Sequence, residues 1–268
     1  MPEEPQVNIS GDTDGSAAAV FETGEAATRA EAVVDELGRL YWQKTYGGKD
    51  AFESLVRTIL SQNTSDVASQ PAHDALMERY GSDEGDLAGA LADAEQSQLA
   101  ETISSAGLYN QKSEMIIGAA ERICEEYGGA DGFGAFVREE EPSEVRESLL
   151  DIHGVGPKTA DCVLLFAGGR DGVFPVDTHV HRIARRMGLA PADADHETVR
   201  EHLEADVPPE KCGFGHTAMI QFGREYCSAR KPACLGGPEA CPLYDLCDRV
   251  GVDEVAESVV DPAAAGGE

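Results

Sequence analysis

Four of the seven cysteines in the chain lie close together, in the segment CSARKPACLGGPEACPLYDLC at residues 227–247. Successive cysteines in this segment are separated by six, six and five residues. Four thiolates so near one another suit tetrahedral zinc or an iron–sulfur cluster. Zinc usually takes pairs of ligands only about two to four residues apart, so the wider spacing favours an iron–sulfur cluster over zinc. The density of cysteines in this segment favours a shared centre over four unrelated buried cysteines. The candidate ligands are Cys227, Cys234, Cys241 and Cys247.

The first gap between these cysteines holds a basic pair, Arg230 and Lys231. A loop that is fixed by a metal centre could hold these two cations against a phosphate backbone. Charged pairs on a protein surface are also commonly just solvated. The other cysteines, Cys124, Cys162 and Cys212, lie in apolar helical contexts, where a small core residue is expected.

A second candidate site is the turn His153-Gly154-Val155-Gly156, which lies between two helical runs, the second of which starts at Pro157. The two glycines let the backbone turn sharply, while Val155 anchors the turn in the core. Backbone amides of such a turn, at the N-terminus of a helix, favour a bound anion. The pattern is typical of a helix–hairpin–helix motif that binds phosphate without reading sequence, although a plain pair of antiparallel helices has the same signature.

Two residues that follow the hairpin stand where chemistry is possible. Lys158 lies in the first turn of the next helix, where a neutral amine could attack carbon and form a Schiff base; a plain surface lysine is the alternative. Asp177 stands just before a later helical run, where aspartate is a preferred N-cap. A capping carboxylate that faces Lys158 could also stabilise a positively charged, sugar-like transition state. Arg182, Arg185 and Arg186 follow on the same helix, and Arg182 is a candidate contact to a phosphate backbone.

The overall charge points away from a nucleic-acid partner. The chain has 50 acidic and 21 basic residues and a formal net charge of -29, whereas proteins that bind nucleic acid usually carry a basic surface. Either the ligand is cationic, or the whole surface is acidified for a salt-rich cytoplasm, as in halophiles. Acidic residues spread along the whole chain favour the second explanation. The positions of the remaining cations then say more about the partner than the net charge does.

The sequence also indicates a compartment. No apolar run approaches the roughly 18–20 residues that are needed to span a membrane. The acidic, polar N-terminus lacks the features of a secretory signal, and an odd number of cysteines fits poorly with a closed disulfide framework. We therefore expect a cytoplasmic protein with reduced thiols and no membrane partner.

Apolar residues recur at helical spacing along most of the chain. No convincing strand appears, since the best candidate, GVFPV at residues 172–176, is too short. The predicted fold class is all-α with two helical lobes. Both ends are acidic and are predicted to be disordered tails. The predicted helical segments are residues 30–46, 51–62, 66–80, 114–127, 142–152, 159–169, 179–189, 197–207 and 217–227.

Several of these motifs occur together, and in the same order, in one known family. The run GVGPKTA at residues 154–160, then PVDTH at 175–179, then the four cysteines, resembles the endonuclease III family of helix–hairpin–helix DNA glycosylases. Upstream, ILSQNTSD at 59–66 resembles the LSxQxTD-like segment of that family, and AGLYNQKS at 106–113 resembles its GLYNxKA loop. The resemblance covers roughly residues 33–249.

The resemblance implies a role for each matching residue. Lys158 stands where the family has its lysine nucleophile, and Asp177 where it has its catalytic aspartate. The four cysteines match the ligands of a [4Fe–4S] cluster. Leu108 matches a side chain that wedges into the duplex. Gln62 or Asn63 matches the polar residue that fills the gap left by the flipped base, and both stay open because this chain reads Gln-Asn where the family has a single glutamine.

The same resemblance implies an architecture of two domains with the active site in the cleft between them. One is a six-helix barrel domain that carries the helix–hairpin–helix, at residues 55–172. The other is a smaller helical domain that carries the cluster loop, at residues 29–54 together with 173–249. Acidic tails at residues 1–28 and 250–268 flank them.

The implied function is base excision repair. Such an enzyme removes oxidised pyrimidines from duplex DNA through a lysine Schiff base and cleaves the strand 3′ to the abasic site by β-elimination. A monofunctional glycosylase for mismatched or alkylated bases is an alternative, although such relatives commonly lack the lysine. A non-catalytic iron–sulfur protein that binds DNA is a second alternative. We also expect a monomer associated with the nucleoid, with damaged or abasic duplex DNA as partner and a monovalent cation at the hairpin.

The chain departs from the pattern of the family at three places. The middle pair of cysteines, Cys234 and Cys241, is usually separated by two residues, and here six intervene. His153 replaces the usual proline before the hairpin, and Pro157 replaces a basic residue. Loss of that charge predicts weaker contact with phosphate, unless the surface is adapted to high salt.

Overall fold

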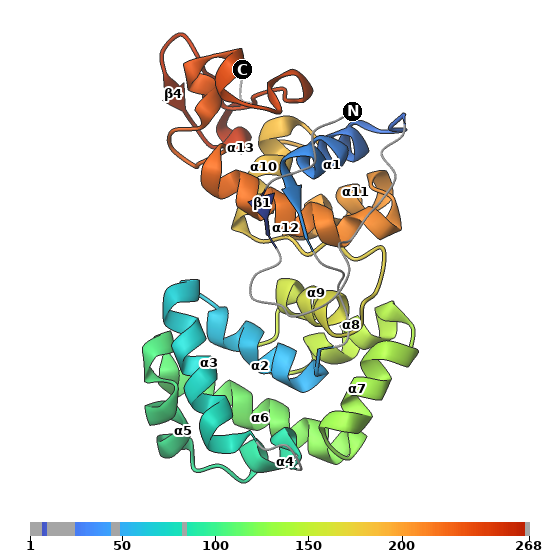
Figure 1. The fold of residues 1–268 in the computed structure, drawn as a ribbon, viewed down its shortest axis with the longest axis vertical. Helices are drawn as coiled ribbons and strands as arrows, with labels where there is room; N and C mark the ends of the chain where they lie inside the picture. Colours follow the sequence, from blue (N-terminus) through green and yellow to red (C-terminus); the bar gives the residue numbers. More distant parts are fainter. Residues whose placement is uncertain (1–6, 10–24, 44–48, 82–84, 266–268) are drawn as a thin grey trace. The chain divides into compact units, whose positions relative to one another are not determined.

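The chain divides into two compact units (Figure 1). The continuous unit comprises residues 46–170, and the discontinuous unit comprises residues 1–45 together with 171–268. The predicted domain boundary after residue 54 falls inside one helix, α2 (Ala51–Ser61), which belongs entirely to the continuous unit. The computed structural model describes residues 7–9, 25–43, 49–81 and 85–265.

The continuous unit is a group of helices around α2 (Figure 1). This helix begins at the N-cap Asp50, whose side chain accepts a hydrogen bond from the amide of Glu53. Its apolar face, which includes Phe52, Leu55 and Ile59, is fully buried against neighbouring helices. The other elements are α3 (Asp66–Tyr80), α4 (Leu87–Ala92), α5 (Gln96–Thr102), the short 3-10 turn η1 (Ser104–Ala106), α6 (Tyr109–Tyr127), α7 (Ala130–Glu139), α8 (Pro142–Leu150) and α9 (Pro157–Phe166).

The discontinuous unit combines the N-terminal helix α1 (Arg29–Leu40) with the C-terminal third of the chain. A second apolar core, which includes Val34, Leu37 and Phe222, lies between α1 and the C-terminal helices. The ammonium group of the buried Lys211 pairs with Asp35 across this contact, at 2.6 Å. The C-terminal elements are α10 (Thr178–Met187), α11 (His196–Asp206), α12 (Pro209–Glu225), the 3-10 turns η2 (Ala233–Gly236), η3 (Pro238–Ala240) and η4 (Tyr244–Leu246), and the short helix α13 (Pro262–Ala265).

Short strands are the other regular elements of the described residues. β1 (Val7–Asn8) pairs in parallel with β2 (Tyr41–Trp42), and β3 (Val252–Asp253) pairs antiparallel with β4 (Ser258–Val259). The helix predicted for residues 30–46 therefore ends early, because the chain turns extended after Leu40 to form β2. The fold is nonetheless all-α, as predicted.

The prediction of a disordered C-terminal tail is wrong for residues 253–265. The amide of Val250 donates to Arg186 O, and the Asp261 carboxylate pairs with Arg185 at 2.5 Å. Glu254 pairs with Arg249 at 2.7 Å. The acidic composition of this segment favoured disorder. Composition does not show that Arg185, on α10, and Arg249, earlier in the loop, pair with its carboxylates. Most of the predicted N-terminal tail, residues 1–6 and 10–24, lies outside the described residues.

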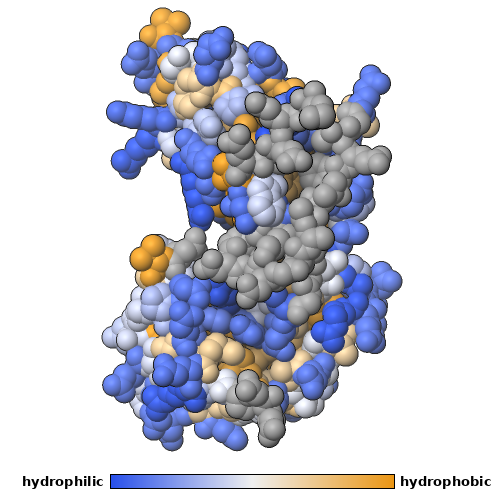
Figure 2. Space-filling view, in the orientation of Figure 1, coloured by the Kyte–Doolittle hydropathy of each residue, from blue (hydrophilic) through white to orange (hydrophobic). Residues whose placement is uncertain are grey.

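Hydrophilic residues cover most of each unit on the face that Figure 2 shows. Among the described residues, no helix is both long and apolar enough to cross a membrane. A few large apolar side chains are exposed to solvent: Val7, Val67, Leu108, Tyr109, Val255 and Val260. Leu108 is the one that the sequence had marked as a candidate for contact with DNA.

Candidate active site and cysteine loop

Lys158 stands in the first turn of α9, directly after the hairpin. Gly156 caps this helix and Pro157 occupies its first position, where a proline costs no hydrogen bond. The half-buried side chain of Lys158 lines a cavity of about 220 Å³ within the continuous unit. The other lining residues are Lys49, Ser54, Arg57, Thr58, Ser61, Ser69, Gln70, Cys162 and Phe166.

Two further cations share this cavity with Lys158. The ammonium of Lys49 lies 5.8 Å from the ring centre of Phe166, and burial, with the charge of Arg57 nearby, lowers the pKa of Lys49. The guanidinium of Arg57 donates to Gln70 Oε1 at 2.5 Å. Cations and hydroxyl groups around one cavity suit a polar or anionic ligand.

Sequence reasoning missed Lys49 and Arg57, although a signal for the cavity wall was present. Polar residues recur every three or four positions along the otherwise apolar α2, at Ser54, Arg57, Thr58 and Ser61. That spacing places them on one helix face, and a polar face on a largely buried helix often marks a site.

The hairpin has the geometry that its glycines predict. Gly154 has φ +86°, and a Cβ at this position would lie 2.5 Å from Met115 Sδ, so only glycine fits. Val155 is buried, and its amide donates to Ile152 O at 3.0 Å. His153 is exposed. The helices on either side of the turn are therefore joined by a tight loop, in which two glycines allow the sharp turn and Val155 is the apolar anchor.

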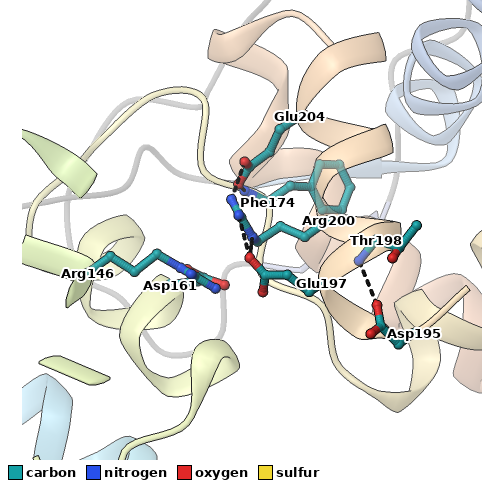
Figure 3. Close-up of polar contacts among 8 residues, drawn as sticks. All are labelled: Arg146, Asp161, Phe174, Asp195, Glu197, Thr198, Arg200 and Glu204. Atoms are coloured by element: carbon teal, nitrogen blue, oxygen red, sulfur yellow. Dashed lines mark hydrogen bonds and ion pairs between the residues drawn. The ribbon is translucent and has the colours of Figure 1, made fainter. Parts of the chain in front are cut away.

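An ion pair locks the two helices of this motif together. The guanidinium of Arg146 on α8 donates to the buried carboxylate of Asp161 on α9 at 2.7 Å (Figure 3). Both side chains are largely shielded from water, where a hydrogen-bonded pair is stronger than at the surface. The pair holds α9, and with it Lys158, at a set angle to the hairpin.

The two candidates for the gap-filling residue lie in different environments. The side-chain amide of Gln62 donates to Gly154 O at 3.0 Å and to Thr159 Oγ1 at 3.2 Å, so Gln62 is bound to the hairpin. Asn63 is exposed and has the left-handed backbone angle φ +52°. Leu108, before α6, is also left-handed, with φ +47°, and its side chain is 55% exposed.

Asp177 is the N-cap of α10, as predicted. Its Oδ1 atom accepts hydrogen bonds from the amides of His179 and Val180, each at 2.8 Å. The segment before it is anchored by the buried ring of Phe174, whose amide donates to Glu204 at 3.1 Å. Glu204 is in turn held by Arg200, as Figure 3 shows. Lys158 belongs to the continuous unit and Asp177 to the discontinuous unit.

The four predicted cysteine ligands line a single pocket in the discontinuous unit. Cys227 and Cys234 are buried, and Cys241 and Cys247 are partly buried. Burial raises the pKa of the Cys247 thiol to about 12, so a metal centre is what would keep thiolates here at neutral pH. The remaining lining residues are Arg186, Met187, Phe222, Tyr226, Pro232, Tyr244 and Arg249.

Most of this chain is similar to known repair proteins. Residues 56–209 match the family described as HhH-GPD superfamily base excision DNA repair protein, and residues 227–247 match the iron-sulfur binding domain of endonuclease III. Endonuclease III of Thermotoga maritima is 32% identical over 219 residues, which are 81% of this chain and 92% of that protein. The chain belongs to the endonuclease III family.

Other members of the endonuclease III family show the same similarity. The Bacillus subtilis enzyme is 33% identical over 73% of this chain and 80% of its own length. A solved structure of a trapped endonuclease III–DNA covalent intermediate has a TM-score of 0.62 at 29% identity, and covers 76% of this chain and 86% of that one. These similarities confirm the predicted family and class of enzyme, a base excision repair DNA glycosylase with AP lyase activity.

The cysteine loop fits the [4Fe–4S] cluster of the endonuclease III family. All four of these thiols line one pocket. A pocket that four thiols share is suited to a group with several metal atoms. Two nitrogen donors also point at the sulfur atoms, Arg186 Nη1 at 3.4 Å from Cys227 and the Arg249 amide at 3.4 Å from Cys247. Such donors stabilise anionic sulfur.

Arginines of α10 hold the start of this loop. The guanidinium of Arg182 donates to Cys227 O at 2.9 Å, and that of the fully buried Arg186 donates to Ser228 O at 2.8 Å. Arg182, which the sequence suggested as a contact to DNA, therefore already supports the loop. Arg230 and Lys231, just beyond, are exposed to solvent.

The longer segment between Cys234 and Cys241 forms two short turns. The turns η2 and η3 follow each other there, joined at Gly237, whose φ of +96° favours glycine. Both cysteines still line the one pocket. The longer gap therefore leaves all four cysteines at the same pocket.

Removal of one ligand is expected to empty this site. Cys241→Ser should lose most of the bound iron and sulfide, because a hydroxyl is a poor ligand for the cluster, and the loop that the cluster holds should then become labile to protease. Iron and sulfide analysis with visible absorption spectroscopy measures the loss. Cys124→Ser, a partly buried cysteine in the other unit, is the matched control and should keep a full cluster.

Proposed function

We propose that this member of the endonuclease III family removes oxidised pyrimidines from duplex DNA by attack of Lys158 on C1′ of the damaged nucleotide. The observation that supports this role is the position of Lys158 in a polar cavity at the start of the hairpin helix. None of the described residues that line the cavity is acidic, so its amine has no carboxylate there to pair with. A substrate with a phosphate backbone would bring the negative charge that the cavity lacks.

The reaction proceeds in two stages. The lone pair of the Lys158 amine forms a bond to C1′, and the damaged base leaves with the electrons of the glycosidic bond and takes up a proton. Opening of the sugar gives a Schiff base between Nζ and C1′. Loss of a proton from C2′ then expels the 3′ phosphate by β-elimination, which cuts the strand 3′ to the lesion.

Asp177 has a carboxylate oxygen to spare for this chemistry. Both capping hydrogen bonds are made to Oδ1, and among the described residues Oδ2 has no hydrogen-bond partner. We propose that this oxygen faces the sugar of the damaged nucleotide. There it stabilises the positive charge that develops as the base departs, and it helps to remove a proton from Lys158.

In this proposal, several elements of the protein contact the duplex. The base must leave the helix to be reached, so the protein must fill the gap and separate the neighbouring bases. The environments of the two candidates support Asn63 as the gap-filling residue, because Gln62 is bound to the hairpin. Leu108 is the wedge. The hairpin amides with Arg230 and Lys231 bind the backbone, and chromosomal DNA in the cytoplasm is the substrate.

Substitutions at this pair should separate the two roles. Asn63→Ala should weaken binding to duplexes with a flipped base, and leave the melting temperature unchanged because the side chain is exposed. Gln62→Ala should lower the stability by about 1–3 kcal/mol, since two acceptors near the hairpin lose their donor. Thermal unfolding and binding to a duplex with a reduced abasic analogue measure both. A larger loss of binding in Gln62→Ala, at equal stability, would reverse the assignment.

The proposed function is tested by borohydride trapping on a duplex with one thymine glycol, at low and high potassium chloride. A covalent protein–DNA adduct is expected, because borohydride reduces the Schiff base. Activity should persist at high salt, where screening weakens the repulsion between DNA and a protein of net charge -29. Abasic sites without an adduct would instead indicate a monofunctional glycosylase, and neither product on any lesion would indicate a protein that only binds DNA.

A further inference from the structure

Two loops of the continuous unit each expose one residue in the left-handed backbone conformation. Asn63 follows α2 and Leu108 precedes α6, and both have positive φ angles, +52° and +47°. Asparagine adopts this conformation more readily than other residues with a Cβ, whereas a leucine needs the surrounding structure to hold it there. Contacts in this unit must therefore keep at least the loop of Leu108 in place.

Lys112 on α6 connects these two loops. Its side chain is only 2% exposed. The ammonium donates to Leu60 O at 2.7 Å and Thr64 Oγ1 at 2.6 Å on one side, and to Ala106 O at 2.9 Å on the other. The hydroxyl of Thr64 also contacts Ala106 O directly. One side chain thus joins the end of α2, the loop after Asn63 and the turn before Leu108.

The chemistry of this contact is unusual for a buried lysine. The ammonium has three N–H donors, and its three partners here are all neutral oxygen atoms. Burial lowers the pKa of Lys112. By contrast, Lys211 in the discontinuous unit, which is also buried, is paired with the carboxylates of Glu31 and Asp35. A lysine without a carboxylate is a costly way to stabilise a core, which indicates a role in placing the loops.

We propose that Lys112 is a positioning residue that sets the two loops at the spacing at which Asn63 and Leu108 enter one duplex together. The inference rests on the proposed function of these two residues in base extrusion. Lys112 itself is buried and acts through the loops. A shift of about 1 Å in either loop would be enough to spoil simultaneous insertion, since such displacements cost on the order of a hundredfold in rate at other sites.

The test compares Lys112→Met and Thr64→Val with wild type in the full chain with its cluster. Lys112→Met removes all three hydrogen bonds of the ammonium. Thr64→Val removes only the bond to the hydroxyl and keeps the other two, so it still tests the inference if Lys112→Met folds poorly. Arg122→Gln, which removes a partly exposed cation further along the same helix, is the control. Three signals are recorded: duplex thymine-glycol release in single turnover, cleavage of a single-stranded abasic oligonucleotide, and fluorescence of 2-aminopurine placed opposite the lesion.

Base release from the duplex is expected to fall about tenfold to a hundredfold in Lys112→Met and less in Thr64→Val. Single-stranded cleavage, which needs no insertion into a helix, should stay within about twofold of wild type, and the rise in 2-aminopurine fluorescence on binding should be lost. An equal fall on both substrates, or unchanged duplex release, would overturn the inference. Failure of the proposed function would look different from failure of this inference. In the first case wild type would form no trapped adduct, while the 2-aminopurine fluorescence would still show whether Lys112 affects insertion into the duplex.

Discussion

Lys158→Ala should form no borohydride-trapped adduct with thymine-glycol or abasic duplexes. Cleavage of the abasic strand should fall by at least about a thousandfold, because the amine that forms the covalent bond to C1′ is gone. The substitution should leave the fold intact, since Lys158 is only half-buried and lies in a helix turn where alanine is favourable. Denaturing gels of the trapped complex measure the adduct, and circular dichroism checks the fold.

The matched control for this result is Lys49→Ala. Lys49 lines the same cavity, and burial lowers its pKa, so among the described residues it is the alternative amine nucleophile at that site. We expect Lys49→Ala to bind DNA less well and still be trapped. If Lys49→Ala abolished the adduct while Lys158→Ala kept it, the nucleophile would be Lys49, and the role given to Lys158 would be wrong.

Asp177→Asn should lose base release by about 10²–10⁴-fold while keeping the stability of wild type. The reason is that the two functions of Asp177 have different requirements. An amide oxygen can accept the hydrogen bonds from His179 and Val180 and so remains a good N-cap. It carries no charge to stabilise the transition state and cannot take a proton from Lys158. Single-turnover release of the base, with thermal unfolding, separates these effects.

Two companions make this comparison sharper. Asp177→Ala should lose activity to a similar extent and also about 1 kcal/mol of stability, because the cap is removed as well. Asp195 caps α11 in the same way, and its Oδ1 accepts from the Thr198 amide at 2.8 Å (Figure 3). Asp195→Asn should leave both rate and stability unchanged. An Asp177→Asn variant that released the base at the full rate would show that Asp177 is only a cap.

The acidic composition is compatible with the proposed DNA substrate, because basic residues lie at the proposed contact sites. Five of the 21 basic residues lie where the chain would meet DNA: three line the Lys158 cavity, and Arg230 and Lys231 lie exposed on the cysteine loop. Part of the remaining charge is consumed within the fold. Arg146, Arg185, Arg200 and Lys211, for example, are paired with carboxylates. Net charge therefore describes the surface as a whole and says little about the binding face.

The sequence by itself determined those features that depend on neighbours along the chain. Helical periodicity of apolar residues predicted most of the helices and the all-α class, because one helix face recurs every three or four residues. The cap at Asp177 is equally local, since its acceptor bonds amides two and three residues ahead. The turn at Gly154 needs φ +86°, a requirement that the residue type alone reveals.

Only the tertiary structure decided the features that join distant segments. The choice between Gln62 and Asn63 rests on a hydrogen bond to Gly154, 92 residues away. The link through Lys112 spans 52 residues to Leu60, and the folded C-terminus depends on Asp261 reaching Arg185 across 76. Each residue looks like ordinary polar surface in sequence. Its role appears only when packing brings a partner to it and excludes water, because a buried donor or charge must be satisfied wherever its partner lies in the chain.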